Sequence, residues 1–242
     1  MAKHEEIAES LTRDILSGQY RTGERLPSER DLSVRFEANR GAVREAMKKL
    51  EQLGIANIQP GGARVAPLEE ASLDVIGHML ALGDLPDSKL VIHIIEVISA
   101  LVRLAVESAL NTATDEDIER LREHNRPLFE EDLDDLAHME ARLELMGAIM
   151  SASDNLVCQL IARSLLAQLT PRTEPLKAFA QFDTEAHADN ARRLDEALAK
   201  RDADALRHVF TESTALTRES VLRSFEAYDA ANRAPLTGVA AS

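Results

Sequence analysis

Apolar residues recur with helical spacing along most of this chain, and the pattern changes only near residue 55. The first helix is predicted at about 4–17, where Ile7, Leu11 and Ile15 share one face and Gly18 follows as a stop signal. This helix opens a compact N-terminal region whose remaining elements are short and closely spaced.

Two further helices are predicted with only a tight turn between them. Ser28 is the expected N-cap of the second helix, in which Leu32 and Phe36 lie on one face. Asn39 is the expected N-cap of the third helix, which ends at Gly54. Its apolar residues recur at i, i+4, i+7 and i+10: Val43, Met47, Leu50 and Leu53. This arrangement predicts a helix-turn-helix, whose second helix enters the major groove of DNA by its N-terminal end.

A β-hairpin is predicted directly after the third helix. Residues 55–58 and 63–65 flank the turn sequence Pro60-Gly61-Gly62. A helix-turn-helix followed by a hairpin is a winged helix, so residues 1–67 are predicted to form a DNA-binding domain.

The remainder of the chain predicts helices without strands. We expect them near 71–83, 87–111, 115–129, 132–152, 155–169, 182–199 and 202–228, with Thr114 and Asp154 as caps of the third and fifth. Such a series predicts a helical bundle, and bundles form ligand pockets between facing helices. Residues 68–230 are therefore expected to form an all-helical effector-binding and dimerisation domain, and residues 231–242 a flexible tail. The predicted fold class is mainly α: a winged helix-turn-helix with a small hairpin wing, followed by an all-α bundle of about six to seven helices.

The net charge of −14 is distributed unevenly between these two regions. Residues 1–67 hold 11 Lys+Arg against 10 Asp+Glu, a net charge of +1, whereas the rest holds 17 against 32, a net charge of −15. Because acidic surface repels phosphate, we expect the second region to stay off the DNA.

The compartment is also predicted from composition. Cys158 is the single cysteine and cannot form an internal disulfide, which favours a reducing compartment. Residues 1–20 are charged throughout, unlike a signal peptide. The apolar stretch at 90–110 is interrupted by Glu96, Arg103 and Glu107, so it predicts a core helix rather than a membrane span. We expect a cytoplasmic protein without a membrane partner.

The candidate DNA contacts lie around the third helix and on the hairpin: Arg30, Asn39, Arg40, Gly41, Arg44, Gly61, Gly62 and Arg64. An arginine at the start of a recognition helix can donate two hydrogen bonds to guanine O6 and N7. The alternative for these arginines is a salt bridge to Glu29 or Glu45 on a solvated surface. Because one such domain offers few contacts, we expect a homodimer that reads a short palindrome in double-stranded DNA.

These residues resemble the N-terminal domain of the GntR superfamily of bacterial regulators. The resemblance is carried by Ile15-Leu16-Ser17-Gly18, Gly23, Leu26 to Leu32, Arg40, Val43-Arg44-Glu45-Ala46, Leu50, Gly54 and Gly61-Gly62. The helical remainder is similar to the effector domain of the FadR subfamily, through its helix layout and Ser151 to Asn155. The resemblance implies that the matching arginines contact guanines or phosphates.

Many members of that subfamily bind a metal ion in the bundle through one Asp and three His. The aligned positions here are Arg142, Met146, Ala191 and Ser213, which are not normal metal ligands. We therefore expect no metal and no cofactor. A relocated site is the alternative, built from Asp134, His138, His187 and His208.

Arg142 lies on a mostly apolar helix, where it can bind a carboxylate or phosphate in place of the metal. An internal salt bridge to Glu140, to Glu144 or to a neighbouring helix is the alternative. Arg103 and Met146 complete the candidate effector residues, although Arg103 is also expected to be buried with a carboxylate partner. The acyl-CoA-responsive members of the subfamily also lack the metal site. The resemblance therefore implies an acyl-CoA or fatty acid effector ahead of small carboxylates.

We predict a DNA-binding transcription regulator, specifically a repressor released from its operator by a small acidic metabolite. An effector-independent architectural DNA-binding protein is one alternative. An enzyme that uses the bundle is another, but no Gly-rich phosphate loop, nucleophile–base pair or metal constellation supports it.

Overall fold

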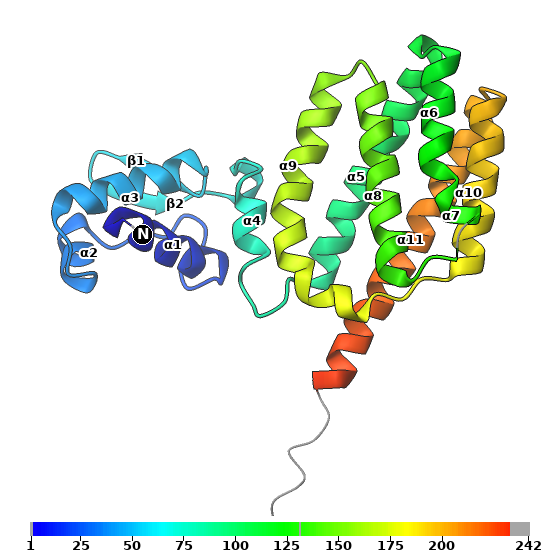
Figure 1. Ribbon diagram of the computed structural model, residues 1–242. Coiled ribbons are helices and arrows are strands. Elements are labelled where there is room, and N and C mark those ends of the chain that lie inside the picture. The colour runs from blue at the N-terminus through cyan, green and yellow to red at the C-terminus, as the bar shows by residue number, and fades with distance from the viewer. Residues whose placement is uncertain (1, 131, 233–242) are drawn as a thin grey trace, which may run out of the picture. The chain divides into compact units, whose positions relative to one another are not determined.

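The computed structural model describes residues 2–130 and 132–232, which divide into two compact units, one up to Pro86 and one from Asp87 onward. The N-terminal unit contains α1 (Lys3–Leu16), α2 (Glu29–Arg35), α3 (Arg40–Gln52), β1 (Ala56–Gln59), β2 (Gly62–Val65), the 3-10 helix η1 (Leu68–Glu70) and α4 (Val75–Met79). The C-terminal unit contains α5 (Ser88–Thr112), α6 (Asp115–Asn125), α7 (Pro127–Glu130), α8 (Asp135–Ala152), α9 (Leu156–Thr173), the 3-10 helix η2 (Glu174–Phe179), α10 (Thr184–Ala199) and α11 (Ala203–Asn232) (Figure 1). The mainly α fold class, with a two-stranded wing and a helical bundle, is confirmed.

The winged helix forms as its caps and turns predict. The side chain of Ser28 accepts a hydrogen bond from the backbone N–H of Asp31 at 3.3 Å, and that of Asn39 accepts one from Ala42 at 2.9 Å. β1 and β2 pair antiparallel, with Ala56 opposite Val65. The predicted apolar faces meet in one core, whose fully buried members include Ile7, Leu11, Leu32, Val43, Leu50 and Ile55.

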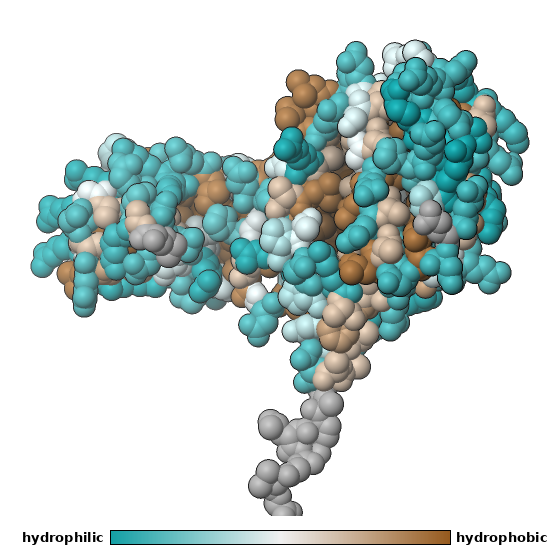
Figure 2. Space-filling model, viewed as in Figure 1, coloured by the Kyte–Doolittle hydropathy of each residue, from teal (hydrophilic) through white to brown (hydrophobic). Residues whose placement is uncertain are grey.

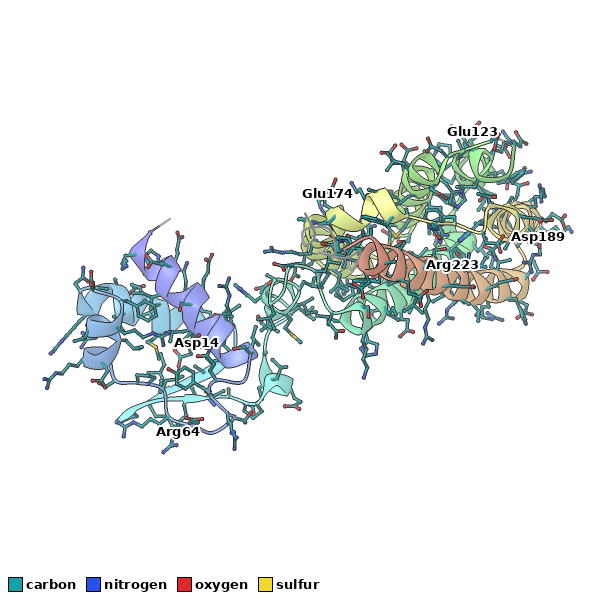
Figure 3. All side chains as sticks on the ribbon, turned by 90° about the horizontal axis from the view of Figure 1, so that it is seen from below. Asp14, Arg64, Glu123, Glu174, Asp189 and Arg223 are labelled. Atoms are coloured by element: carbon teal, nitrogen blue, oxygen red, sulfur yellow. The ribbon has the colours of Figure 1, made fainter. Side chains whose placement is uncertain are left out.

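An ion pair joins the first two helices at the edge of this core. Arg35 donates to the buried carboxylate of Asp14 at 2.8 Å, and its guanidinium lies 4.8 Å from the centre of the Phe36 ring. Figure 3 shows Asp14 within the helical part of the N-terminal unit. The pKa of Arg35 is raised, chiefly by the hydrogen bond to Asp14, so this arginine has a structural role.

The N-terminal unit extends beyond the boundary expected after residue 67. The helix expected at 71–83 is instead η1 followed by the short α4. Val75 packs into the winged-helix core, and the backbone N–H of Ser72 donates to the carbonyl of Leu53 at 2.9 Å. A Cβ at Gly54 would lie 2.7 Å from the carbonyl oxygen of Glu70, so this glycine permits the close approach. Residues 68–86 therefore fold with the DNA-binding unit.

The C-terminal unit is a bundle in which α5 packs against α8, α9 and α11, while α10 packs against α6 and α11. Its core includes Val102, Leu121, Ile149, Leu198 and Leu206. On the face shown in Figure 2, apolar residues gather over α8 and α9. Within the part of the chain that the structure describes, no helix is long and apolar enough to cross a membrane.

Several helix boundaries in the bundle differ from the sequence expectations. The helix expected at 115–129 is divided into α6 and α7, since Pro127 lacks the N–H that would continue the backbone ladder. By contrast, α9 continues through Pro171 with one backbone bond fewer. Asn155, rather than Asp154, caps α9 by accepting from the N–H of Cys158 at 3.0 Å. Thr114 caps α6 as expected.

The last helix is longer than expected. α11 reaches Asn232, and Tyr228 in its final turns packs edge-on against Phe179 with ring centroids 5.3 Å apart. Residues 231 and 232, which were assigned to a tail, therefore belong to this helix. The rest of that tail, residues 233–242, lies outside the described residues.

Candidate DNA interface and candidate effector cavity

The N-terminal end of α3 presents arginines to solvent. Arg40 and Arg30 are exposed, and neither side chain has a hydrogen-bond or ion-pair partner among the described residues. Arg44 is also exposed, but its Nε donates to the Glu29 carboxylate at 2.9 Å, and this interaction raises the pKa of Arg44. The salt bridge considered from sequence therefore forms at Arg44 and involves Glu29; Glu45 instead pairs with Lys48 at 2.8 Å. An exposed pair of this kind is weak enough to exchange for a base or phosphate contact.

The first turn of α3 is shaped by its cap. The Asn39 side chain is occupied by the N–H of Ala42, so it orders the helix start that carries Arg40. A Cβ at Gly41 would lie 3.2 Å from Asn39 Oδ1, and glycine thus leaves room for the cap. These two residues position the arginines, whether or not they also contact DNA.

A second pair of arginines meets at the wing, one from β2 and one from the segment before α2. Arg64 Nη1 donates to the carbonyl of Gly23 at 2.8 Å, and Figure 3 shows Arg64 on the wing strand. Arg25, which the sequence did not single out, donates to the carbonyl of Gly61 and forms a β-bridge with Arg64. A Cβ at Gly62 would lie 2.9 Å from Arg25 Nε, so the glycine at the tip makes space for that guanidinium. Both wing glycines have positive φ, 105° at Gly61 and 132° at Gly62.

The C-terminal unit contains a cavity of about 340 Å³ among its helices. The four positions that the resemblance aligned with metal ligands all line it: Arg142, Met146, Ala191 and Ser213. Most of the remaining lining residues are apolar, and many of these come from α5, α8 and α9. They include Ile95, Ile98, Val102, Ile149, Leu166 and Leu169.

Arg142 is the charged centre of this cavity. Its Nη1 contacts His187 Nδ1 at 2.6 Å, and its Nη2 donates to Thr217 Oγ1 at 2.5 Å and Ser213 Oγ at 3.4 Å. Neither Glu140 nor Glu144 pairs with it, and no carboxylate among the described residues lies within salt-bridge distance. Burial lowers the pKa of Arg142 to about 10, so it remains a cation at neutral pH. The internal salt bridge considered from sequence is therefore absent from the part of the chain that the structure describes.

Two neutral histidines stand beside Arg142. An arginine N–H can only donate, so His187 Nδ1 must accept and the imidazole carries its proton on Nε2. Burial, and then the neighbouring Arg142, lower the pKa of His187 to about 3 and that of His138 to about 4. The two rings lie 5.1 Å apart, edge to face.

A line of hydroxyl groups on α11 faces the same cavity. Ser213, Thr217, Ser220 and Ser224 recur at i, i+4, i+7 and i+11, and all four line the wall. The hydroxyl groups of Thr217, Ser220 and Ser224 donate to backbone carbonyls of the preceding turn, which leaves their oxygens as acceptors. Apart from Ser213, these residues were not identified from the sequence, although their helical spacing is visible there and indicates a polar stripe on this helix.

The structure brings together only part of the predicted effector set. Met146 lines the cavity with Arg142, but Arg103 does not. Arg103 lies on the solvated side of α5, where it pairs with Glu107 at 3.4 Å one helical turn away. Lys177 also lines the wall, and it is paired with Glu174 at 2.8 Å.

The relocated metal site is not assembled. The Asp134 side chain caps α8 by accepting from the N–H of Ala137 at 2.8 Å. His208 is exposed and its Nδ1 contacts the carbonyl of Asp204, whereas His138 and His187 lie inside the cavity. The described residues contain no group of three or more His, Cys, Asp or Glu side chains placed to hold a metal ion.

Two buried polar atoms in the cavity wall have no partner among the described residues. These are His138 Nε2 and Asn125 Oδ1. The Asn125 side chain is anchored by its Nδ2, which donates to the carbonyl of Ala191 at 2.8 Å. Buried polar atoms are nearly always hydrogen-bonded, so unpartnered ones in a cavity are consistent with a site that takes a polar ligand.

Comparison with known proteins agrees with this two-part architecture. Residues 3–65 match the family described as "Bacterial regulatory proteins, gntR family", and residues 93–215 match the FCD domain. The transcriptional regulator Mce2R of Mycobacterium tuberculosis is 24% identical over 220 residues, which cover 90% of this chain and 91% of that protein. The transcriptional repressor NanR of Cronobacter sakazakii is 33% identical over 127 residues, covering 48% of this chain and 45% of NanR. These relatives are transcription regulators rather than enzymes.

The fold also occurs in a solved structure of Lar, which controls expression of the Listeria monocytogenes agr system. That chain superimposes with a TM-score of 0.52 at 17% identity, covering 93% of this chain and 98% of the other. The likeness supports the fold alone.

Proposed function

Because the chain belongs to the gntR family of bacterial regulatory proteins and carries an FCD domain, we propose that it is a transcription repressor released from a palindromic operator by a small anionic effector. It is a DNA-binding transcription regulator by family. The sign of regulation, the operator symmetry and the effector are the proposed parts. Such a regulator acts on the bacterial chromosome, which places it in the cytoplasm.

The operator is read by α3 and the wing in this proposal. Arg40 and Arg44 reach base edges in the major groove, and Arg30 contacts the same region. The wing arginines, with Gly61 and Gly62 at the tip, lie against the backbone or the minor groove. The support is the exposure of these side chains and the absence of strong internal partners at Arg30 and Arg40 among the described residues.

The effector binds in the cavity of the C-terminal unit. The observation that carries this part is Arg142, a cation in a largely apolar cavity with no carboxylate partner among the described residues. A charge in such a place is costly unless it is paired, and an anionic ligand supplies the pair. Ligand binding then favours a conformation that binds the operator less well. A ligand with equal affinity for both conformations would shift nothing.

A homodimer completes the proposal, since two winged helices are needed for two half-sites. Exposed apolar side chains on α9 support a self-association surface there: Leu156, Val157 and Leu160, at 64%, 66% and 57% exposure. We expect Leu160→Glu to give monomers in size-exclusion chromatography with light scattering, while Leu136→Glu on α8 stays dimeric. Unchanged dimers of the Leu160 variant would place the interface elsewhere.

Fluorescence anisotropy with DNA from directly upstream of the protein's own gene tests the DNA-binding part. Arg44→Ala should lose roughly 1–3 kcal/mol of operator affinity and relax the preference at one base of each half-site. Arg192→Ala is a matched control, because Arg192 is an exposed arginine on α10. Equal affinity for operator and unrelated DNA would favour an architectural DNA-binding protein over a regulator of specific operators.

A further inference from the structure

We propose that the cavity binds a free monocarboxylate with an apolar body, held by Arg142 and the neutral His138, and not a coenzyme A thioester. The inference rests on the proposed effector role of this cavity and specifies the class of ligand. The positions aligned with metal ligands carry Arg142, Met146, Ala191 and Ser213 in this chain. The ligand is therefore held by side chains and not by a metal ion.

The charge of the cavity wall matches a ligand with one negative charge. Among the residues that the structure describes, no acidic side chain lines the cavity, and the charged lining residues are Arg142 and Lys177. Lys177 is neutralised by Glu174, and His187 is neutral because it accepts from Arg142. A monoanion therefore balances the wall, whereas a dianion would leave a second charge unpaired in apolar surroundings.

The position of the carboxylate follows from two side chains on one face of α8. His138 and Arg142 are one helical turn apart, and both line the cavity. His138 is 3% exposed, and its ring packs against those of Phe182 and His187 at centroid distances of 4.9 and 5.1 Å. Its imidazole makes no hydrogen bond within the described residues, and Nε2 is fully buried. A carboxylate beside Arg142 accepts from the guanidinium with one oxygen and from the His138 N–H with the other.

The apolar wall and the size of the cavity define the rest of the ligand. Side chains such as Ile98, Met146 and Leu166 offer no polar group, and burying each methylene against them favours binding. The cavity volume of about 340 Å³ lies at the lower end of the range of small-molecule pockets, roughly 300–1,000 Å³. A carboxylate on a chain of about ten carbons fits this volume.

A coenzyme A thioester does not fit these observations. Its acyl end is an uncharged thioester, which would leave Arg142 without a counter-charge. Its nucleotide and phosphate groups carry several negative charges, which Arg142 alone does not balance. The acyl-CoA effector expected from the family resemblance is thereby disfavoured relative to the free acid.

Isothermal titration calorimetry on the full-length protein tests the proposal with four probes of equal chain length: decanoate, decan-1-ol, decanedioate and decanoyl-CoA. Decanoate should bind roughly tenfold to hundredfold more tightly than decanol, because the charge-assisted hydrogen bonds to Arg142 and His138 are lost in the alcohol. Decanedioate and decanoyl-CoA should bind more weakly than decanoate.

Variants assign the effect to the proposed side chains. Arg142→Met should remove the preference for decanoate over decanol, and Arg142→Lys should retain part of it. His138→Phe should weaken decanoate binding by roughly tenfold with little effect on decanol. Arg103→Gln removes a cation of the same unit that does not line the cavity, and it should bind all four probes like the unaltered protein. Thermal melting of each variant shows that it is folded.

Three results would overturn the proposal: equal affinities for decanol and decanoate, tighter binding of decanoyl-CoA, or no binding of decanoate. If decanoate fails while specific, Arg44-dependent operator binding persists, only the ligand class is wrong. If specific operator binding itself is missing, the proposed function fails whatever the calorimetry shows.

Discussion

Arg44 at the start of α3 and Arg142 in the bundle are the same residue type in opposite surroundings. Arg44 is exposed and pairs loosely with Glu29 on the surface. Arg142 lies in an apolar cavity with neutral partners, and the described residues supply it with no carboxylate. The exposed arginine can exchange partners at little cost, whereas the cavity arginine depends on an anion brought from outside.

The contrast extends to the charge of the two units. The net charge of +1 over residues 1–67 allows α3 to approach phosphate, and the net charge of −15 over the rest disfavours DNA. Within that acidic unit, the described part of the chain contributes no acidic side chain to the cavity wall. An anionic ligand would therefore enter a locally positive site inside an otherwise negative unit.

The largest expected effect is a loss of folding stability at low pH, which comes from the two buried histidines of the cavity. His138 and His187 have folded pKa values of about 4 and 3, below the ordinary value of 6.5. Between these folded values and 6.5, the unfolded chain therefore binds more protons than the folded protein. Their contribution to stability is complete above about pH 6.5 and is lost as pH falls towards the folded pKa values. Between pH 7 and pH 5 we expect a loss of about 2 kcal/mol for each histidine.

Urea unfolding at several pH values measures this loss. Replacing both residues, His138→Asn with His187→Asn, should flatten the dependence between pH 7 and 5 whatever it does to the stability at pH 7. His93→Asn on the exposed side of α5 is the control and should leave the slope unchanged. A double variant with the full original slope would show that these histidines do not stay neutral in the folded protein.

A second prediction concerns the free protein without ligand. Arg142→Met replaces an uncompensated cation by an apolar side chain of similar length, so the free energy of unfolding should rise by about 1–2 kcal/mol. Thermal and urea unfolding in the absence of ligand provide the measurement. Arg122→Met is the control with the opposite expectation. Arg122 forms an ion pair with Asp195 through two hydrogen bonds of 3.0 and 2.8 Å, so its replacement should lower the free energy of unfolding. Destabilisation by both substitutions would mean that Arg142 is already paired in the free protein.

The smallest effect is expected at the start of α3. Asn39→Ala removes the side-chain cap that accepts from Ala42, which should cost about 1 kcal/mol of stability. Asn57→Ala on the exposed strand β1 is the control, since this side chain caps no helix. Unfolding monitored by circular dichroism checks the difference, and equal stability of the two variants would show that the cap does not order the helix.

The DNA-binding unit was more predictable than the cavity because its signals are local. Ser28, Asn39 and Gly54 act within a few residues of their own position, and the structure confirms both caps and the end of α3. The extension of this unit to residue 86 was not predictable in that way. It depends on Val75 packing into a core formed by residues far earlier in the chain.

The cavity was predictable only in part because it is made by side chains from different helices. Arg103 and Arg142 look alike in the sequence, each a single cation among apolar residues. Packing turns Arg142 towards the interior and Arg103 towards Glu107 on the surface. Arg142 contacts His187 and Thr217, which follow it in the sequence by 45 and 75 positions. Helical periodicity carries no information about such contacts.

Release of operator DNA tests most directly whether Arg142 couples ligand to DNA binding. Fluorescence anisotropy would follow labelled operator bound to the unaltered protein and to Arg142→Met as decanoate is added. The account predicts equal operator affinity without decanoate, followed by dissociation of the unaltered complex and persistence of the variant complex. Dissociation of both complexes over the same range of decanoate concentration would contradict it.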